Sequence, residues 1–139
     1  MAILNSFQKI MIAAGLLMTA LQQAHADTVV IVSAQSTAPT LSREQIARIF
    51  QGKSYVMTPV DLARPSAVRR EFYTKFVGAD EASVRARWSK LLFTGKRSLP
   101  KEFASSEDLV TAVAADPNTI GYVDRSFVNM TVKVIYTVK

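Results

Sequence analysis

The residues that could do chemistry gather in residues 57–77, MTPVDLARPSAVRREFYTKFV. This stretch predicts a short apolar strand, a tight turn at residues 63–66 (hereafter the elbow), and an amphipathic helix that begins directly after the turn. The first turn of a helix has backbone N–H groups without intrahelical partners and carries a partial positive charge, so it favours an anion. Arg64, Arg69 and Arg70 crowd this end. We therefore expect any small-anion site at the elbow.

A simpler interpretation is that Pro65 and Ser66 only begin a helix, because proline favours the first helical position and serine favours the N-cap. The residue types alone favour this simpler interpretation. In the functional interpretation, the Ser66 hydroxyl is a donor and Arg64 or Arg69 is the counter-charge. Asp61, at the end of the preceding strand, could accept a hydrogen bond from a protonated anion or hold Arg64 in place, and the sequence does not decide between these roles.

Other charged groups have structural explanations. Glu107 and Asp108 are expected in the first turn of a helix, where negative charge complements the macrodipole. Lys96, Arg97 and Lys101 form a basic loop, for which plain solvation is favoured over ligand or membrane contact. No spacing pairs a nucleophile with a base, so we expect a protein that is not an enzyme.

The composition excludes several kinds of site. The chain has no cysteine and one histidine, His25, which rules out disulfides, cysteine nucleophiles and His/Cys metal centres in the mature domain. We expect no metal and no cofactor. The chain has 17 basic and 11 acidic residues, an excess that could attract anionic lipid, nucleic acid or a small anion. Nucleic acid is the weakest of these, because no charge block or basic–aromatic alternation stands out.

Residues 1–26 have the architecture of a secretory signal peptide. Lys9 supplies the positive region, residues 10–21 are an apolar run, and residues 24–26 (AHA) form a small-x-small cleavage site. The run is short for a spanning helix, which needs about 20 residues. We therefore expect cleavage after Ala26, with retention as an anchor the alternative, and a periplasmic domain over residues 27–139.

The remaining pattern predicts an α/β domain with a mixed sheet flanked by helices on both faces. Strands are expected at residues 28–33, 56–62, 120–123 and 130–138, with Pro59 placing the second towards an edge or limiting its pairing. Besides the helix after the elbow, helices are expected to begin at Ser42, at Asp80 and at Ser105 or Ser106. The helix after Asp80 would bury Val84, Trp88, Leu91 and Leu92.

Four segments of the sequence, taken together and in this order, resemble those of a known protein family. They are LSREQIARIFQGK (41–53), TPVDLARPSAVRREFY (58–73), RWSKLLFTGK (87–96) and PNTIGYV (117–123). They resemble the phosphate-binding proteins of bacterial ABC uptake systems and, more closely, short single-domain exported proteins related to them. The resemblance implies a single periplasmic-binding-protein-like lobe of type II. It also implies phosphate or a similar oxyanion as ligand.

The family's phosphate loop falls on residues 61–68 here. Ser66 matches its serine, while Ala67 and Val68 stand where a glycine and a threonine follow, so they can offer backbone N–H groups only. Arg64 lies near the family's arginine. The candidate ligand-binding residues are therefore Asp61, Arg64, Ser66, Ala67, Val68 and Arg69.

The sequence thus predicts an exported solute-binding-type domain, related to ABC-type phosphate uptake, that holds a small oxyanion at a helix start. The alternative is a periplasmic interaction module without a ligand, docking on a transporter permease, a sensor or a second copy through the sheet edge and the basic loop. Neither expectation includes nucleic acid or a stable membrane span after cleavage.

Overall fold

A run of β-branched residues builds β1 (Thr28–Ser33), in which every residue is buried. The computed structural model, which describes residues 27–139, places β1 between two antiparallel neighbours, β4 (Thr119–Asp124) and β5 (Val132–Thr137). The predicted signal peptide lies outside the described residues. Such continuous burial matches the apolar pattern of an inner strand.

The sheet has five strands in the order β3-β2-β4-β1-β5. β2 (Thr58–Leu62) pairs in parallel with β4 and with β3 (Lys101–Phe103), whereas β1 is antiparallel to both of its neighbours. The sheet is therefore mixed, as expected. Since β2, β3 and β4 run in the same direction, their carboxyl ends meet at one edge.

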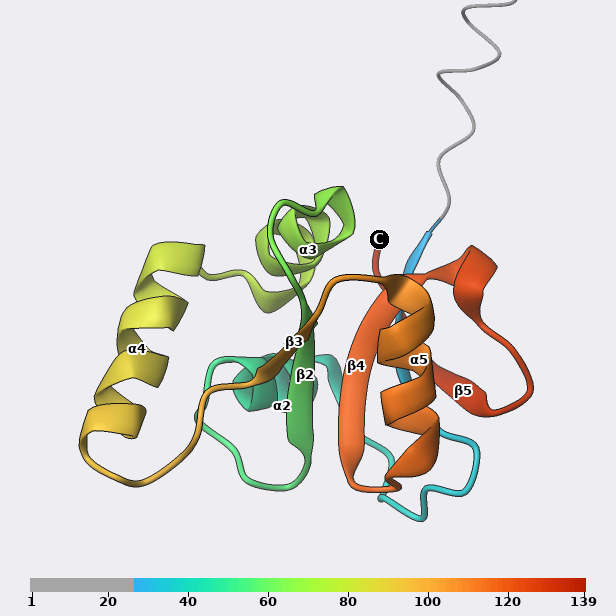
Figure 1. Ribbon diagram of the computed structural model, residues 1–139, viewed down its shortest axis with the longest axis horizontal. Coiled ribbons are helices and arrows are strands. Elements are labelled where there is room, and N and C mark those ends of the chain that lie inside the picture. The colour runs from blue at the N-terminus through green and yellow to red at the C-terminus, as the bar shows by residue number, and fades with distance from the viewer. Residues whose placement is uncertain (1–26) are drawn as a thin grey trace, which may run out of the picture.

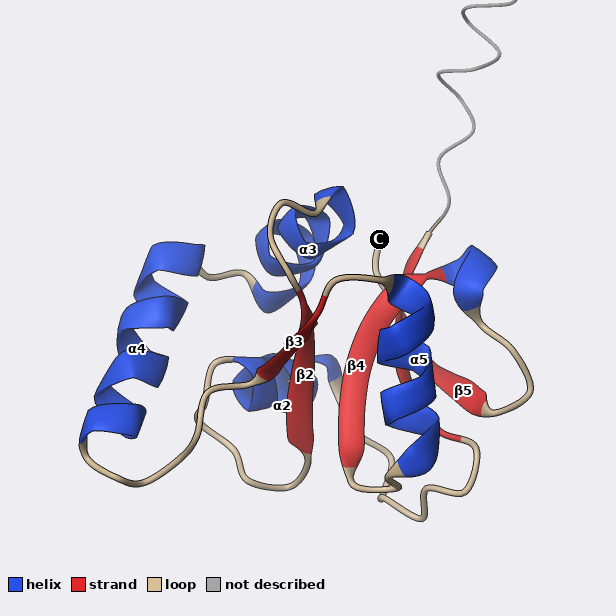
Figure 2. Ribbon diagram, in the orientation of Figure 1, coloured by secondary structure: helices blue, strands red, loops and turns tan. Residues whose placement is uncertain are grey.

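Helices cover both faces of the sheet (Figures 1 and 2). α5 (Ser106–Ala115) lies on one face. α2 (Arg43–Phe50), the short α3 (Ala67–Glu71) and the π-helical turn η1 (Phe72–Val77) that continues it lie on the other side. A 3-10 turn, η2 (Arg125–Phe127), precedes β5.

Two adjacent residues of β4 show how the faces differ. A Cβ at Gly121 would come within 2.9 Å of Leu109 Cδ2 and 3.1 Å of Val113 Cγ2, so the missing side chain lets α5 approach the sheet. On the opposite face, the Tyr122 ring stacks on Phe72 with centroids 4.0 Å apart and meets the edge of Phe50. The described part encloses one continuous core in which no buried side-chain nitrogen or oxygen lacks a partner, as expected of a unit that folds on its own.

The helix starts confirm several sequence predictions. Ser42 and Gln45 form the reciprocal capping box of α2, and Ser105 caps α5. Gly52 and Gly78, with φ of 75° and 68°, follow the last residues of α2 and η1. These local signals succeed because the cap and its partner lie within a few residues of each other.

Four features differ from the sequence predictions. The basic loop ends in a third parallel strand, β3, which was not expected. β2 is an inner strand, and Pro59 lies before the first residue that pairs with β3, so its missing N–H leaves the ladder intact. Six residues after α3 are π-helical, a local widening that apolar spacing does not indicate.

The fourth difference concerns α4 (Glu81–Phe93), which buries Val84 and Trp88 but leaves Leu92 exposed. The helix projects from the rest of the fold, with its C-terminal end away from the elbow (Figure 1). The indole Nε1–H of Trp88 donates to the Phe50 carbonyl at 2.9 Å, and this hydrogen bond links α4 to the C-terminal end of α2. Within residues 27–139, no helix combines the length and apolarity needed to cross a bilayer.

Candidate functional site

The elbow lies at the edge where the parallel strands end. β2 ends at Leu62, and the next residue, Ala63, donates its N–H to the Phe103 carbonyl at the end of β3, at 2.8 Å. The Arg64–Pro65 peptide bond is cis, and α3 begins at Ala67. This is the edge at which ligands bind in open α/β sheets.

Ser66 is the N-cap of α3, and its Oγ accepts the N–H of Arg69 at 3.1 Å. The hydroxyl proton of Ser66 stays available, because a capping hydroxyl accepts through its lone pairs. The N–H groups of Ala67 and Val68 belong to the first turn, where no intrahelical acceptor exists. The elbow therefore offers two amides and one hydroxyl as donors.

Arg69 turns inward and is 8% exposed. Its Nε donates to Glu81 Oε1 at 3.0 Å, and its Nη1 donates to the Leu62 carbonyl at 2.7 Å and to Glu102 Oε1 at 3.2 Å. Nη2 has no protein partner among residues 27–139, yet no buried side-chain nitrogen there is unpaired. Nη2 therefore reaches solvent.

Asp61 is 4% exposed and accepts hydrogen bonds from two phenols. Tyr122 donates to its Oδ1 at 2.9 Å, and Tyr73 donates at 2.9 Å to Oδ1 and 3.1 Å to Oδ2. Burial raises the pKa of Asp61 above its ordinary 3.8, while the charge of Arg69 and the two phenols oppose that rise. Burial, together with the neighbouring Asp61 charge, also raises the pKa of both tyrosines, so they remain donors at neutral pH.

Arg69 stays charged in this setting. Burial lowers its pKa, but the Asp61 charge and the hydrogen bond that Arg69 donates to Glu81 outweigh that effect and raise the pKa overall. Three carboxylates, those of Asp61, Glu81 and Glu102, thus act on one guanidinium. The geometry stabilises the cation and limits the attraction it exerts on a further anion.

A cavity of about 410 Å³ opens beside this group, between the sheet edge and α4. Its polar wall carries Arg64, Arg69 and Arg85 together with the three carboxylates, and Val84, Trp88, Leu99 and Pro100 form its apolar wall. The formal charges of the wall cancel. Arg64 and Arg85 are exposed and make no ion pair with the described residues, so both are available counter-charges, and Arg64 is the one that belongs to the elbow.

The structure brings some predicted site residues together and separates others. Asp61, Arg64 and Arg69 border this cavity, whereas Ala67 borders a shallower hollow on the other side of α3, along with Arg70. Ser66 and Val68 are half-buried between the two. Asp61 bonds to the two tyrosines and makes no ion pair with Arg64. The proposed roles of the six residues remain predictions.

Sequence reasoning missed Tyr73, Tyr122, Glu81 and Glu102 as members of this site. Tyr73 and Tyr122 stand within apolar stretches, where aromatic side chains usually pack in the core. One available signal was Asp61 itself, since a carboxylate in an apolar strand requires buried donors. Which side chains supply them depends on strand order, which the sequence pattern does not give.

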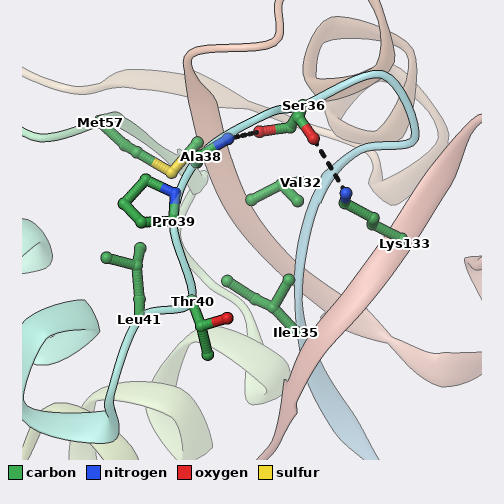
Figure 3. A pocket seen from close by; sticks show the side chains of 9 residues that line it. All are labelled: Val32, Ser36, Ala38, Pro39, Thr40, Leu41, Met57, Lys133 and Ile135. Carbon is green, nitrogen blue, oxygen red and sulfur yellow. Dashed lines mark hydrogen bonds between the residues drawn. The ribbon is translucent and has the colours of Figure 1, made fainter.

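A second cavity, of about 250 Å³, lies at the opposite edge, beyond the end of β1 (Figure 3). Its polar groups bond to one another: Lys133 Nζ donates to the Ser36 carbonyl at 2.9 Å, and Ser36 Oγ accepts the Ala38 N–H at 3.3 Å. Val32, Met57 and Ile135 make its wall largely apolar. Among residues 27–139, no cluster of three His, Cys, Asp or Glu side chains is placed to hold a metal ion.

Comparison with solved structures identifies proteins of similar fold. A Clostridium perfringens protein described as a phosphate ABC transporter substrate-binding protein, with phosphate bound, superposes with a TM-score of 0.64 at 18% identity, over 78% of this chain and 44% of that one. An ABC-type phosphate transport receptor of Vibrio cholerae gives 0.62 at 16% identity, over 78% and 45%. PstS of Borrelia burgdorferi gives 0.59 at 10% identity, over 78% and 46%.

The resemblance noted in the sequence is therefore confirmed at the level of the fold: this is a periplasmic-binding-protein-like α/β lobe. The chain spans less than half the length of each of these structures. No protein-family model matches the chain, and no curated protein matches it in sequence.

Proposed function

We propose that this chain is an exported solute-binding-type domain that holds a small oxyanion, phosphate or one like it, at the elbow, and that it is part of or related to ABC-type phosphate uptake. One observation carries the proposal. Arg64 and Arg69 border one cavity, Arg69 stands in the first turn of α3, and its Nη2 reaches solvent. The phosphate-transport proteins of the same fold support the choice of ligand.

Each residue has a distinct part in the proposal. Arg64 is the exposed counter-charge, Arg69 supplies Nη2 from a fixed position, and Ser66 with the amides of Ala67 and Val68 supplies neutral donors. Asp61 is a positioning residue, because with its two tyrosines it sets the field that keeps Arg69 charged and in place.

The carboxylates favour a particular form of anion. Glu81 and Glu102 lie on the cavity wall, so a fully ionised anion is repelled there, whereas an anion that carries a proton can donate it to one of them. Phosphate carries a proton at neutral pH and sulfate does not. We therefore expect phosphate to bind more tightly than sulfate, with an affinity of roughly millimolar because few cationic donors remain unpaired.

The test is an NMR titration of residues 27–139 with phosphate and, in parallel, sulfate. Shifts are expected at the amides of Ala67 and Val68, which saturate with phosphate and are weaker with sulfate. Arg64→Gln should weaken phosphate binding about tenfold, since it removes a charge-assisted hydrogen bond of about 1.4 kcal/mol. Arg48→Gln, on the exposed side of α2, is the control and should leave the titration unchanged.

Arg64 is preferred to Arg69 as the test variant, because truncating Arg69 leaves two glutamates and a carbonyl without their donor. A folded protein whose elbow amides do not move in about 20 mM phosphate contradicts the proposal, given the millimolar affinity expected. Equal responses of Arg64→Gln and Arg48→Gln would also contradict it, since binding would then be non-specific.

A further inference from the structure

The C-terminal end of α4 and the loops beside it carry exposed apolar side chains. Among the described residues, five of the seven large apolar side chains that are exposed lie in two short segments: Tyr55, Val56, Leu92, Phe93 and Leu99. Phe93 is 90% exposed. Single exposed apolar residues are ordinary on a protein surface, but a gathering of them marks an interaction site.

Arg97 links the segment at Tyr55 to the segment at the end of α4. Its guanidinium lies 4.4 Å from the Tyr55 ring centroid and 4.8 Å from that of Trp88, and its Nη1 donates to the Ser54 carbonyl at 3.0 Å. Tyr55, Trp88 and Leu99 share a shallow groove of about 390 Å³. The apolar groups are therefore held on a fixed surface rather than scattered over mobile loops.

The same region is strongly basic. Residues 82–101 contain six cations and no acid, which equals the net charge of +6 of the entire chain. Lys90, Lys96 and Lys101 are exposed and make no ion pair with the described residues. The helix dipole accounts for a lysine near the end of α4, but it does not account for twenty residues without an acid or for an exposed phenylalanine.

We propose that this surface, the basic tip (Tyr55, Val56 and residues 90–101), attaches to the anionic headgroup layer of a lipid bilayer. Phe93 and Leu92 insert between the lipids, and Lys90, Lys96 and Lys101 contact headgroup phosphates. The combination of apolar side chains with flanking lysines is the chemistry of interfacial attachment. Attachment of this kind needs no spanning helix.

The shape favours a bilayer over a protein partner. Phe93 is the last residue of α4, which lies at one side of the fold (Figure 1), and its ring is 90% exposed, so it protrudes into solvent. A soft anionic layer accommodates a protruding ring without a matching hollow.

The exposed end of α4 lies away from the elbow, although Leu99 and Pro100 of the basic tip also line the cavity of about 410 Å³ beside the elbow. Glu81, at the start of α4, bonds to Arg69, whereas Phe93 lies about 18 Å further along the helix axis at 1.5 Å per residue. Insertion of Leu92 and Phe93 therefore takes place away from Arg69, and it does not depend on phosphate binding.

Sedimentation with lipid vesicles tests the proposal, using residues 27–139 in phosphate-free buffer. Vesicles of phosphatidylcholine with about 30% phosphatidylglycerol should bind the domain at least tenfold more tightly than pure phosphatidylcholine vesicles. Phe93→Ser should weaken binding about tenfold through lost apolar burial. Lys96→Gln should weaken it about fivefold, the usual effect of one basic residue at an anionic surface.

Two matched controls lie away from the tip. Met130→Ser removes a side chain that is 96% exposed in the turn before β5, and Lys139→Gln removes a charge at the end of the chain. Both should leave vesicle binding unchanged. Thermal unfolding of each variant checks the fold, which exposed positions should leave intact.

Three results would overturn the proposal: no sedimentation with the anionic vesicles at low salt, equal binding to neutral and anionic vesicles, or loss of binding in the control variants to the same extent as in the tip variants. An acidic protein as the true partner would give the first of these.

Discussion

Tyr122 on β4 donates its phenol proton to Asp61 on β2 at 2.9 Å, and the same phenol oxygen accepts the Leu62 N–H at 3.3 Å. One side chain thus satisfies a buried carboxylate and a buried amide on the neighbouring strand. Its ring meanwhile stacks on Phe72 at the start of η1. This contact links the sheet, the turn after α3 and the charged group at the elbow.

Removing the Tyr122 hydroxyl should lower the free energy of unfolding. Tyr122→Phe keeps the ring stack but leaves the Leu62 N–H without an acceptor and removes one donor from Asp61, so we expect a loss of about 1–3 kcal/mol of unfolding free energy. Urea unfolding measures it. Tyr136→Phe is the control, because its hydroxyl bonds to none of the described residues, and its effect should stay within about 0.5 kcal/mol. Equal effects would mean that the Tyr122 hydroxyl has no net structural value.

The buried carboxylate should make stability depend on pH. The pKa of Asp61 is raised in the folded protein, so the folded state retains that proton to higher pH than the unfolded state does. The stabilising contribution is therefore complete below the ordinary pKa of 3.8 and is lost as pH rises through the folded-state pKa.

Asp61→Asn isolates this contribution, since the amide does not titrate. The difference in unfolding free energy, wild type minus variant, should fall as pH rises from about 4, by about 1.4 kcal/mol for each unit of pKa difference. Urea unfolding of both proteins at several pH values between 4 and 8 measures it. A difference that grows with pH would mean that Arg69 and the two phenols outweigh burial.

The attachment of α4 depends on a glycine after α2. A Cβ at Gly52 would lie 2.9 Å from Leu91 Cδ1 and 3.3 Å from Trp88 Cε2, and its φ of 75° is already unfavourable for other residues. Gly52→Ala should therefore destabilise the domain by about 1 kcal/mol through its backbone and by about 1–3 kcal/mol more through crowding. The fluorescence of Trp88, the one tryptophan in the chain, should report the displaced helix.

Gly78 provides the comparison. Its φ is 68°, but nothing lies within 4 Å of a Cβ built there, so Gly78→Ala should show the backbone effect alone. If the two variants lose equal stability and the Trp88 emission is the same in both, Gly52 is not a packing site for α4.

Ser66 allows helix capping to be separated from anion binding. Ser66→Asp keeps an oxygen that can accept the Arg69 N–H, so stability should change by less than about 0.5 kcal/mol, whereas Ser66→Ala should lose about 1 kcal/mol. If phosphate binds at the elbow, the new carboxylate should weaken its binding at least tenfold through like-charge repulsion. Unchanged phosphate affinity in a stable Ser66→Asp protein would place the anion elsewhere.

Some features of this protein follow from local sequence signals, and others follow only from tertiary contacts. The sequence alone determined the caps at Ser42 and Ser66, a helix start at Ser105 or Ser106, the buried strand β1 and the position of the elbow, because each depends on residues a few positions apart. Only the tertiary structure decided that Arg69 turns inward to Glu81 and Glu102, and that Tyr73 and Tyr122 meet at Asp61. Those partners lie 12 to 61 residues apart in the chain, and strand order brings them together at the carboxyl edge of the sheet. Strand order follows from how apolar faces pack, which a one-dimensional pattern does not contain.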